Sequence, residues 1–537
     1  MSMFLNRLVL RRKSLLLTVV LLLGSALTAC LTTEEGEAIS VDTLIVNGLV
    51  YAGKNQAPIE AAVGVTGDKI VFVGNPEKHK LITSRTIDAS GKIVAPGLID
   101  PHTHSLSDLQ NANGDGKNSN LNYLTQGVTT VFNGNDGRGP TNTGELIDGF
   151  NRNGIGTNTA LFVGHGFVRT QVMGQDNRKP TDAELQEMKT LIAKSMEEGA
   201  LGFSTGLFYV PGTYSDTAEV IELSKVAAKY GGIYESHIRD ESTYNIGVVA
   251  AVQEVLDIGN GADIPVHIGH IKALGVDVWG ESTRIIELIE QAQANGQTVT
   301  ADQYPWSASS TRLHSAAIPR EVLAGGYEEY SKRLRDPVLL PEIRAGIAEN
   351  IRRRGGPESF LMVQGEVPSI IGKTLAQLSE EQNKDPVTVV IESVLAGSVG
   401  IASFNMNEED IANFMKKPWV MTSSDGTNGH PRKYASYPRK YREYVAKKGV
   451  ISEQDFIYRS SGLVADTFGI NNRGYLQPGF YADIVVIDTD RYEQVADFKN
   501  WNKLTTGVDY VLVNGKVVIE DGNYNGALAG KALRLND

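Results

Sequence analysis

Short runs of apolar residues alternate with amphipathic stretches along the middle of the chain. Short runs rich in Val, Ile and Phe predict buried strands, whereas apolar residues spaced three and four apart predict helices. The stretch from Thr181 predicts a helix, because Thr181 and Glu184 form a Thr-x-x-Glu capping box and Gly199 follows the last apolar position. The predicted strands are 98–100, 128–132, 160–164, 200–204, 232–237, 265–270, 298–302 and 419–425, and further helices are predicted at about 217–229, 246–258 and 281–296.

These elements predict one large α/β domain. Strands that alternate with helices form parallel βα units, and eight units over about 330 residues fit a (β/α)8, TIM-like barrel. The interval 331–417 is longer than one helical crossover, so we expect an insertion over the barrel mouth between strands seven and eight. We therefore assign residues 96–475 to the barrel and about 331–417 to the insertion.

Both ends of the chain show a different pattern, in which short strands are separated by Gly, Asn and Asp turns. Such strands are predicted near the N-terminus at 44–48, 70–74 and 92–94, and near the C-terminus at 482–487 and 510–519. Because the pattern returns after the barrel, we expect the two ends to form one small β-sandwich domain from residues 41–95 and 476–537.

The first 29 residues have the pattern of a secretory signal. The basic segment Arg11-Arg12-Lys13 precedes the apolar run 14–23, which is too short and wrongly flanked for a transmembrane span. The segment ends in Leu27-Thr28-Ala29-Cys30, which resembles the bacterial lipobox, whose cysteine becomes the lipidated first residue. We therefore expect a signal peptide at 1–29, a lipid anchor on Cys30 and a tether at 30–40. The alternative is an ordinary cleaved signal without lipid.

From this pattern we expect the protein in the bacterial cell envelope, as an exported lipoprotein on the periplasmic or cell-surface side of a membrane. Cys30 is the only cysteine, so an intrachain disulfide is excluded. The formal net charge of −12 argues against a nucleic-acid partner, because phosphate binding needs basic patches.

Candidate chemistry begins at the end of the first predicted barrel strand, where His102 and His104 are one residue apart. In an extended strand, side chains at positions i and i+2 point to the same side. Both imidazoles can therefore face one centre, and neutral imidazole is a preferred ligand of zinc. The alternative is two unrelated loop histidines, and further ligands elsewhere in the chain decide between the two.

The other predicted strand ends supply such ligands. Enzymes with this barrel place their reactive groups at the C-terminal ends of the strands, so these residues should converge. In chain order the candidates are His102 and His104, Asp136, His165, Ser204, His237, His270, Tyr304 and Asp425. Imidazole and carboxylate together form a suitable zinc ligand set.

Several longer motifs in this constellation resemble the amidohydrolase superfamily and, more narrowly, the N-acyl-D-amino-acid deacylases (D-aminoacylases). The resemblance covers nearly the whole mature chain. It rests on 96–104 (PGLIDPHTH), 198–207 (EGALGFSTGL), 236–241 (SHIRDE), 270–272 (HIK), 302–305 (DQYP) and 424–426 (SDG). It implies one or two zinc ions, or another divalent metal, and the metal ligands that it implies are His102, His104, His237, His270 and Asp425.

One position departs from the family pattern. Family members usually have Gly-Asn-Cys-Gly after the second strand, with the cysteine as a metal ligand, whereas this chain has Gly134-Asn135-Asp136-Gly137. Asp136 would bind or bridge metal through carboxylate oxygens, which are harder ligands than thiolate. The alternative is a simple turn aspartate, because Asn-Asp-Gly is also ordinary turn chemistry.

The resemblance also implies a binding site for the substrate carboxylate, formed by Lys272, Tyr304, Ser309 and Arg432. An arginine and a lysine beside one carboxylate form a suitable clamp. The alternative for each cation is a surface charge, and the interval from Asp425 to Arg432 is shorter than in the family. We expect His165 to shape the pocket and not to bind metal.

These residues predict a metal-dependent hydrolase of an amide bond, in which Asp425 takes a proton from water and passes it to the leaving amine. The small-molecule substrate implied by the resemblance is an N-acyl-D-amino acid, whereas spacing and composition say nothing about handedness. The alternatives are a dipeptidase or cyclic-amide hydrolase, or a non-catalytic metal- or ligand-binding lipoprotein. A serine hydrolase built on the Gly-x-Ser-x-Gly pattern at Ser204 is disfavoured, because residues 207–212 continue as a loop.

Overall fold

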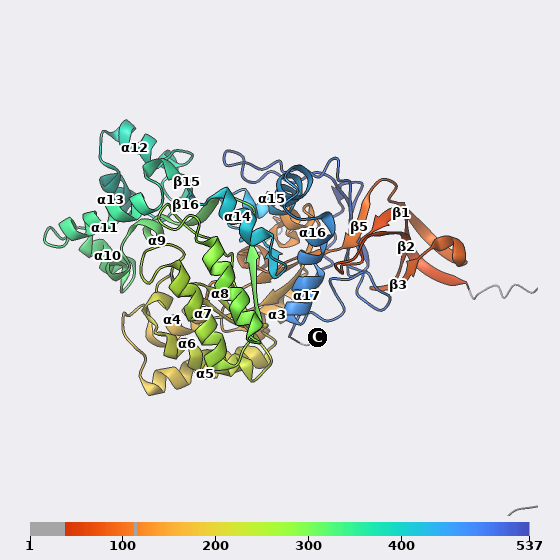
Figure 1. Ribbon diagram of the computed structural model, residues 1–537, viewed down its shortest axis with the longest axis horizontal. Helices are drawn as coiled ribbons and strands as arrows, with labels where there is room; N and C mark the ends of the chain where they lie inside the picture. Colours follow the sequence, from red (N-terminus) through yellow and green to blue (C-terminus); the bar gives the residue numbers. More distant parts are fainter. Residues whose placement is uncertain (1–37, 112–114, 536) are drawn as a thin grey trace, which may run out of the picture.

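The computed structural model describes residues 38–111, 115–535 and 537 (Figure 1). The expected signal peptide and Cys30 lie outside the described residues, as does most of the expected tether. The end of that tether is already strand, because β1 begins at Ile39. Within the described part of the chain, we find no helix of the length and hydropathy that crossing a membrane requires.

Strands from both ends of the chain form one small β domain, which lies opposite the insertion at the far side of the barrel (Figure 1). β5 pairs antiparallel with β18, and this ladder joins the N-terminal strands to the C-terminal ones. β1 pairs with β2 on one side and with β4 and β5 on the other. The strands are β1 (Ile39–Val50), β2 (Ile59–Thr66), β3 (Lys69–Gly74), β4 (Leu81–Asp88), β5 (Ile93–Pro96), β18 (Ile484–Ile487), β19 (Val508–Val513), β20 (Lys516–Glu520) and β21 (Asn523–Tyr524).

The last residues of the chain depart from the expected domain division. Gly530 pairs with Ile155 and Ala532 pairs with Thr159, so this segment lies against the barrel and not in the β domain. The side chain of Asn514, between β19 and β20, donates to Asn158 Oδ1 (2.8 Å) and Ala529 O (2.8 Å). The chain end therefore ties the β domain to the base of the barrel.

The predicted (β/α)8 barrel is confirmed. Its strands pair in parallel throughout, and a parallel bridge between Thr103 and Gly426 closes the ring. The barrel strands are β6 (Leu98–Asp100), β7 (Val128–Asn133), β8 (Asn158–Leu161) continued by β9 (Val163–Gly164), β10 (Gly202–Gly206), β11 (Ile233–His237), β12 (Val266–Ile268), β13 (Val299–Gln303) and β17 (Val420–Thr422).

Amphipathic helices cover the outside of the barrel, and Figure 1 shows α5 to α8 on one flank of it. α5 begins with the predicted capping box, in which Thr181 Oγ1 accepts from Glu184 N (3.3 Å) and Glu184 Oε2 accepts from Thr181 N (2.8 Å). Its buried face, Met188, Ile192 and Met196, packs into the barrel core. The helices outside the insertion are α1 (Leu106–Leu109), α2 (Leu121–Leu124), α3 (Thr143–Asn153), α4 (His165–Met173), α5 (Asp182–Glu197), α6 (Thr217–Ala228), α7 (Val248–Ala262), α8 (Ser282–Ala294), α14 (Glu408–Met415), α15 (Arg432–Arg439), a π-helix (Lys440–Lys447), α16 (Glu453–Arg459) and α17 (Gly462–Phe468).

The insertion between β13 and β17 starts earlier than the expected residue 331. It contains an antiparallel sheet of β14 (Ala308–Arg312), β16 (Val399–Phe404) and β15 (Phe360–Gly365), so the chain leaves the barrel soon after β13. After this sheet the chain returns to the barrel through α14, which packs on barrel helix α8. The insertion has its own core, and its helices are α9 (Leu313–Ala317), α10 (Tyr327–Arg333), α11 (Leu340–Arg353), α12 (Leu375–Gln382) and α13 (Pro386–Ala396).

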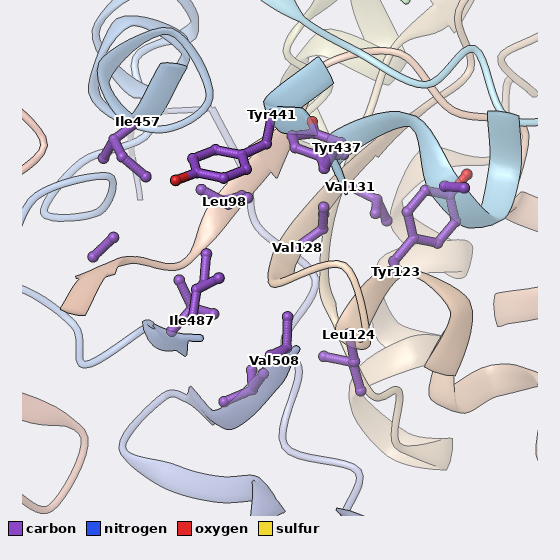
Figure 2. Packing of buried hydrophobic residues seen from close by; sticks show 14 of the residues in the cluster. Leu98, Tyr123, Leu124, Val128, Val131, Tyr437, Tyr441, Ile457, Ile487 and Val508 are labelled. Carbon is purple, nitrogen blue, oxygen red and sulfur yellow. The ribbon is translucent and has the colours of Figure 1, made fainter. Parts of the chain in front are cut away.

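One apolar cluster spans the barrel and the β domain (Figure 2). Leu98 and Val128 from barrel strands belong to the same cluster as Ile487 and Val508 from the β domain. Tyr437 of α15 lies in it as well, and its hydroxyl donates to the carbonyls of β6 and β17 at Ile99 (3.1 Å) and Thr422 (3.2 Å). This shared core stabilises the part of the barrel where β6 and β17 are neighbours, and His102 and Asp425 follow these two strands.

Candidate metal centre

The six predicted metal ligands meet at the C-terminal ends of the barrel strands. Each follows its strand closely: His102 and His104 after β6, Asp136 after β7, His237 at the end of β11, His270 after β12 and Asp425 after β17. Five of the six side chains are buried, and His104 is partly exposed. The barrel thus brings together residues that are up to 323 positions apart in the chain, from His102 to Asp425.

Four of the ligands form one group. Asp136 Oδ1 lies 3.3 Å from His102 Nε2, and Asp136 Oδ2 lies 3.3 Å from His104 Nε2. Asp425 Oδ1 lies 3.1 Å from His104 Nε2 and 4.0 Å from His102 Nε2. These four side chains together offer donor atoms that could hold one metal ion.

Asp136 also belongs to a second group, with His237 and His270. Its Oδ1 lies 3.2 Å from His270 Nε2 and 3.6 Å from His237 Nδ1, and these two nitrogens are 2.8 Å apart. The carboxylate of Asp136 therefore stands between two donor groups, which is the position of a bridging ligand. This favours the metal interpretation of Asp136 over a turn aspartate.

The donor set fits a divalent metal. Four ligands at about 2.0 Å around one tetrahedral ion are separated from one another by about 3.3 Å, and the separations around Asp136 lie close to this value. Among the described residues, His102 Nε2 and Asp136 Oδ1 are buried atoms with no hydrogen-bond partner. Buried polar atoms are rarely left without a partner, so these atoms point to a bound cation.

The backbone around the centre is strained in the same way at three ligands. Asp136, His270 and Asp425 have φ angles of 59°, 36° and 46°, in the left-handed region that non-glycine residues seldom adopt. Such a conformation costs of order 1–3 kcal/mol and persists only where the surroundings enforce it. At Asp136 the backbone N–H donates to buried Glu235 Oε2 (3.2 Å), which helps to hold the ligand loop.

Asp302 contacts two of the ligand histidines, His102 and His270, and the sequence analysis did not predict this role. Its Oδ2 lies 3.4 Å from His102 Nδ1 and 2.9 Å from His267 Nε2, and its Oδ1 accepts from His270 N (3.0 Å). Burial raises the pKa of Asp302, but His102 and His267 outweigh it and hold that pKa well below its usual range. A carboxylate on the far nitrogen of a ligand histidine orients the ring. The signal in the sequence was the position of Asp302 in a barrel strand, within one of the resemblance motifs.

Glu241 was likewise missed, although it ends the motif that contains His237. Its carboxylate forms an ion pair with Lys272, and its Oε1 lies 3.2 Å from His270 Nδ1. Lys272 Nζ is in turn 2.7 Å from the same His270 Nδ1. Burial raises the pKa of Glu241, but Lys272, His237 and His270 outweigh it and hold that pKa well below its usual range. The structure thus places Lys272, predicted to bind substrate, directly behind a ligand histidine.

The remaining predicted substrate residues line the same cavity of about 90 Å³ as His104 and Asp425. Arg432 is buried, with Nη1 2.8 Å from Asp425 Oδ2 and its guanidinium 4.7 Å from the centre of the Tyr304 ring. Burial raises the pKa of Asp425, but Arg432 and His270 outweigh it and keep that pKa below its usual range. Ser309, on β14, enters the cavity from the insertion.

Two other predicted candidates lie outside the donor groups. His165 Nε2 contacts Glu219 Oε1 (2.9 Å), which also pairs with buried Arg169. Ser204 Oγ donates to Gly134 O (2.5 Å) and accepts from Gly137 N (3.1 Å). Both hydrogen bonds of the Ser204 hydroxyl go to the loop that carries Asp136, which argues against a nucleophilic role.

Comparison with known proteins agrees with this geometry. Residues 85–316 match the family model described as "Amidohydrolase family". The chain is 30% identical to the D-aminoacylase of Alcaligenes xylosoxydans xylosoxydans over 527 residues, which cover 93% of this chain and 99% of that protein. The chain belongs to the D-aminoacylase family of amidohydrolases. It is accordingly a metal-dependent hydrolase that acts on carbon–nitrogen amide bonds.

Other members of the family support the same assignment. An N-acyl-D-glutamate deacylase of the same Alcaligenes species is 30% identical, with 89% of this chain and 93% of that protein covered. A D-aminoacylase crystal structure superposes with a TM-score of 0.78 at 31% identity, covering 92% of this chain and all of that one. The N-acyl-D-glutamate deacylase from Bordetella bronchiseptica, solved with zinc and a phosphonate mimic of the tetrahedral intermediate, gives the same TM-score at 29% identity and the same coverage of both chains. Another D-aminoacylase structure is described by its binuclear metal centre.

Proposed function

We propose that this protein hydrolyses N-acyl-D-amino acids to a carboxylic acid and a free D-amino acid. One observation carries the proposal: the cavity that contains the ligand cluster also contains Arg432, in contact with Asp425. A carboxylate bound by this arginine would have its neighbouring amide at the cluster. The named activities of the Alcaligenes relatives support the choice of substrate, including its D configuration.

The ligands divide between two positions for zinc, or for another divalent metal. His102, His104, Asp136 and Asp425 would hold one ion, and Asp136 with His237 and His270 would hold another. When bound, the metal polarises the amide carbonyl and lowers the pKa of water from 15.7 to about 7. Because carboxylate is a harder ligand than thiolate, Asp136 would shift the metal preference away from that of a cysteine-containing centre.

Asp425 is the proposed catalytic acid and base. Its Oδ1 faces His104 and the ligand cluster, while its Oδ2 is held by Arg432. Since Arg432 and His270 keep the pKa of Asp425 low despite burial, this carboxylate is ionised at neutral pH and can accept the proton of the attacking water. The carboxyl group of Asp425 then passes this proton to the leaving nitrogen, because an unprotonated amide nitrogen is a poor leaving group.

The substrate carboxylate binds, in this proposal, between Arg432, Lys272, Tyr304 and Ser309. All four side chains line the cavity, and the two cations approach the Tyr304 ring, at 4.7 Å for Arg432 and 5.6 Å for Lys272. Arginine presents a planar fork that matches a carboxylate, and lysine adds a second positive charge. Binding here would place the scissile amide beside Asp425.

We also propose that the protein is an exported lipoprotein, anchored to a membrane of the bacterial cell envelope through Cys30. The support is the pattern at the N-terminus: a basic segment, an apolar run of signal-peptide length and Leu27-Thr28-Ala29-Cys30. The acidic body, with a net charge of −12 for the whole chain, agrees with a small-molecule substrate and not with nucleic acid.

The proposed reaction is tested by assaying amine release by the purified protein from matched N-acetyl-D- and N-acetyl-L-amino acids, dipeptides and hydantoins. We expect hydrolysis of the N-acetyl-D-amino acids, loss of that activity with a chelator and recovery with added zinc. Preferred cleavage of dipeptides or hydantoins would identify a different amidohydrolase. A metal-loaded protein without hydrolytic activity would support a binding role instead.

A further inference from the structure

A second cavity, of about 490 Å³, adjoins the active-site cavity. Asp136, Arg138, Phe208, Tyr209 and Arg312 line both cavities and form their common boundary. The wall away from the metal centre consists of α4 and the loop after β10, together with the part of the insertion around α9 and α10. The second cavity is more than five times as large as the first, so it can take a substantial part of a substrate.

The boundary between the cavities carries two arginines without anionic partners. Among the described residues, neither Arg138 nor Arg312 forms an ion pair, and the guanidinium of Arg138 lies 5.0 Å from the centre of the Tyr209 ring. The side chain of Arg312 is exposed but partly desolvated, and this partial desolvation, followed by the positive charge of Arg138, lowers the pKa of Arg312. Glu366 is a carboxylate whose charge reaches Arg312, but its Oε2 accepts instead from Ser398 N (3.1 Å).

A third arginine adds to the positive potential of the second cavity, and the lowered pKa of a nearby histidine is consistent with that potential. Within the described part of the chain, the side chain of Arg320 donates to the backbone carbonyls of Phe208 (2.9 Å) and Ile318 (3.2 Å) and forms no ion pair, so no carboxylate neutralises its charge there. Burial, followed by the charges of Arg312, Arg320 and Arg138, lowers the pKa of His314 to about 4. Among the described residues that line this cavity, Asp136 is the single acidic one. A site with this charge distribution favours an anion.

The position of Asp136 decides which part of the substrate faces the second cavity. Asp425 and Arg432 line only the first cavity, whereas Asp136 lines both. In an N-acyl amino acid the carbonyl carbon is bonded to the amino-acid nitrogen on one side and to the rest of the acyl group on the other. If the carboxylate lies at Arg432 and the amide at the ligand cluster, the acyl group continues past Asp136 toward Arg138 and Arg312.

We propose that the second cavity receives the acyl group and that the preferred acyl group ends in a carboxylate bound by Arg138 and Arg312. The substrate would then be a half-amide of a dicarboxylic acid with a D-amino acid. This inference rests on the proposed function and adds the chemistry of the acyl group to it. Two guanidinium groups at one boundary repel each other, and a carboxylate between them would replace that repulsion with charge-assisted hydrogen bonds.

The test compares kcat/KM of the zinc-loaded protein for N-succinyl-, N-succinamyl- and N-acetyl-D-amino acids, each made with D-alanine, D-leucine and D-phenylalanine. The succinyl and succinamyl groups have nearly the same shape and differ in one negative charge. We expect a preference of about 10- to 100-fold for succinyl over succinamyl, as a hydrogen-bonded charge contributes. N-acetyl-D-glutamate is included to detect a carboxylate bound through the amino-acid side chain.

The arginines are tested with Arg138→Gln, Arg312→Gln and the double variant. Both side chains are exposed, so the fold should tolerate the change. We expect the double variant to lose the succinyl preference, so that its kcat/KM values for the succinyl and succinamyl substrates agree within about threefold. Arg344→Gln is the matched control, because Arg344 lies on α11, lines neither cavity and pairs with Asp385; this variant should keep the preference.

Two results overturn the inference while leaving the proposed function intact. One is hydrolysis of N-acetyl-D-amino acids with equal kcat/KM for succinyl and succinamyl substrates. The other is a preference for N-acetyl-D-glutamate that disappears in the double variant, which would assign these arginines to the side chain. If the wild-type protein hydrolyses none of the N-acyl-D-amino acids, the proposed function fails and this inference fails with it.

Discussion

Arg432 and Asp425 form a buried ion pair beside the ligand cluster, with Nη1 2.8 Å from Oδ2. The other oxygen of the same carboxylate lies 3.1 Å from His104 Nε2. Asp425 therefore joins two functions through one side chain, since one oxygen faces the ligands and the other faces the residue proposed to bind the substrate carboxylate. This division lets substrate binding and proton transfer take place at neighbouring atoms.

Replacing Asp425 with Asn removes the proposed proton acceptor and keeps the size of the side chain. We expect kcat for N-acetyl-D-amino acids to fall by about 10²–10⁴-fold, the usual contribution of a positioned acid and base. Metal content, measured by elemental analysis, should persist through His102, His104 and Asp136. An Asp425→Asn protein that holds metal and turns over at the wild-type rate would remove Asp425 from this role.

Asp136 contacts both donor groups, so it should determine how many ions the protein holds. We expect Asp136→Ala to lose at least one ion per chain and most of its activity. Asp136→Cys should retain two positions and bind zinc more tightly relative to manganese, because thiolate is the softer ligand. Elemental analysis after dialysis against equal zinc and manganese measures both effects. Unchanged metal content in Asp136→Ala would return Asp136 to the role of a turn residue.

Asp302 should act on metal binding through the ligand His102, whose Nδ1 lies 3.4 Å from Asp302 Oδ2. We expect Asp302→Asn to weaken zinc affinity by about 10- to 100-fold, as loss of a carboxylate behind a ligand histidine does. Competition with a chromogenic chelator measures this affinity independently of turnover. The matched control is Thr300→Val, which removes the contact of the Thr300 hydroxyl with His267 Nδ1 (2.8 Å) on the side away from the ligands. An effect of equal size in the control would mean that Asp302 acts only through packing.

Lys440 is fully buried, and among the described residues its Nζ has no hydrogen-bond partner. Burial, assisted by Arg459, lowers the pKa of Lys440 to about 7, whereas Asp302 acts in the opposite direction. We expect Lys440→Met to raise the free energy of unfolding by about 1–4 kcal/mol at pH 7, because the buried cation is replaced by apolar volume. Urea titration measures the change.

This gain should depend on pH. Between about pH 7 and 10 the unfolded chain holds a proton at Lys440 that the folded chain does not, so the wild-type protein becomes more stable as pH rises. The gain from Lys440→Met is therefore largest below pH 7 and shrinks toward pH 10. Lys447→Met, at an exposed lysine of the same helix, should change stability by less than about 0.5 kcal/mol at every pH. A gain independent of pH would show that the charge of Lys440 does not oppose folding.

Cys30→Ser tests the proposed anchor. We expect the full-length wild-type chain, expressed in a bacterial host, to sediment with membranes and to incorporate labelled palmitate. The variant should lose the label, because lipid attachment requires the thiol. Equal labelling of both proteins would contradict the anchor, and an unlabelled soluble wild-type protein would support an ordinary cleaved signal.

The alternation of strands and helices was enough to predict the barrel, because each buried strand and each amphipathic helix has its own short-range period. The insertion was placed less well, since β14 is short and partly exposed and its pairing with β16 joins residues about 90 positions apart, such as Ser309 and Ser403. Neither the pattern nor the length of that segment specifies such a partner.

The sequence by itself predicted which candidate ligands would gather at one face of the barrel. In a parallel barrel every strand ends at the same face, so a histidine or aspartate placed directly after a strand must lie near the others. Only the tertiary structure decided how those ligands are supported and charged: Asp302 behind His102, Glu241 and Lys272 behind His270, and Arg432 on Asp425. These contacts join side chains from different strands at distances of a few ångströms. They depend on the closure of the ring and on the mutual neutralisation of buried charges, and no local pattern in the chain encodes either.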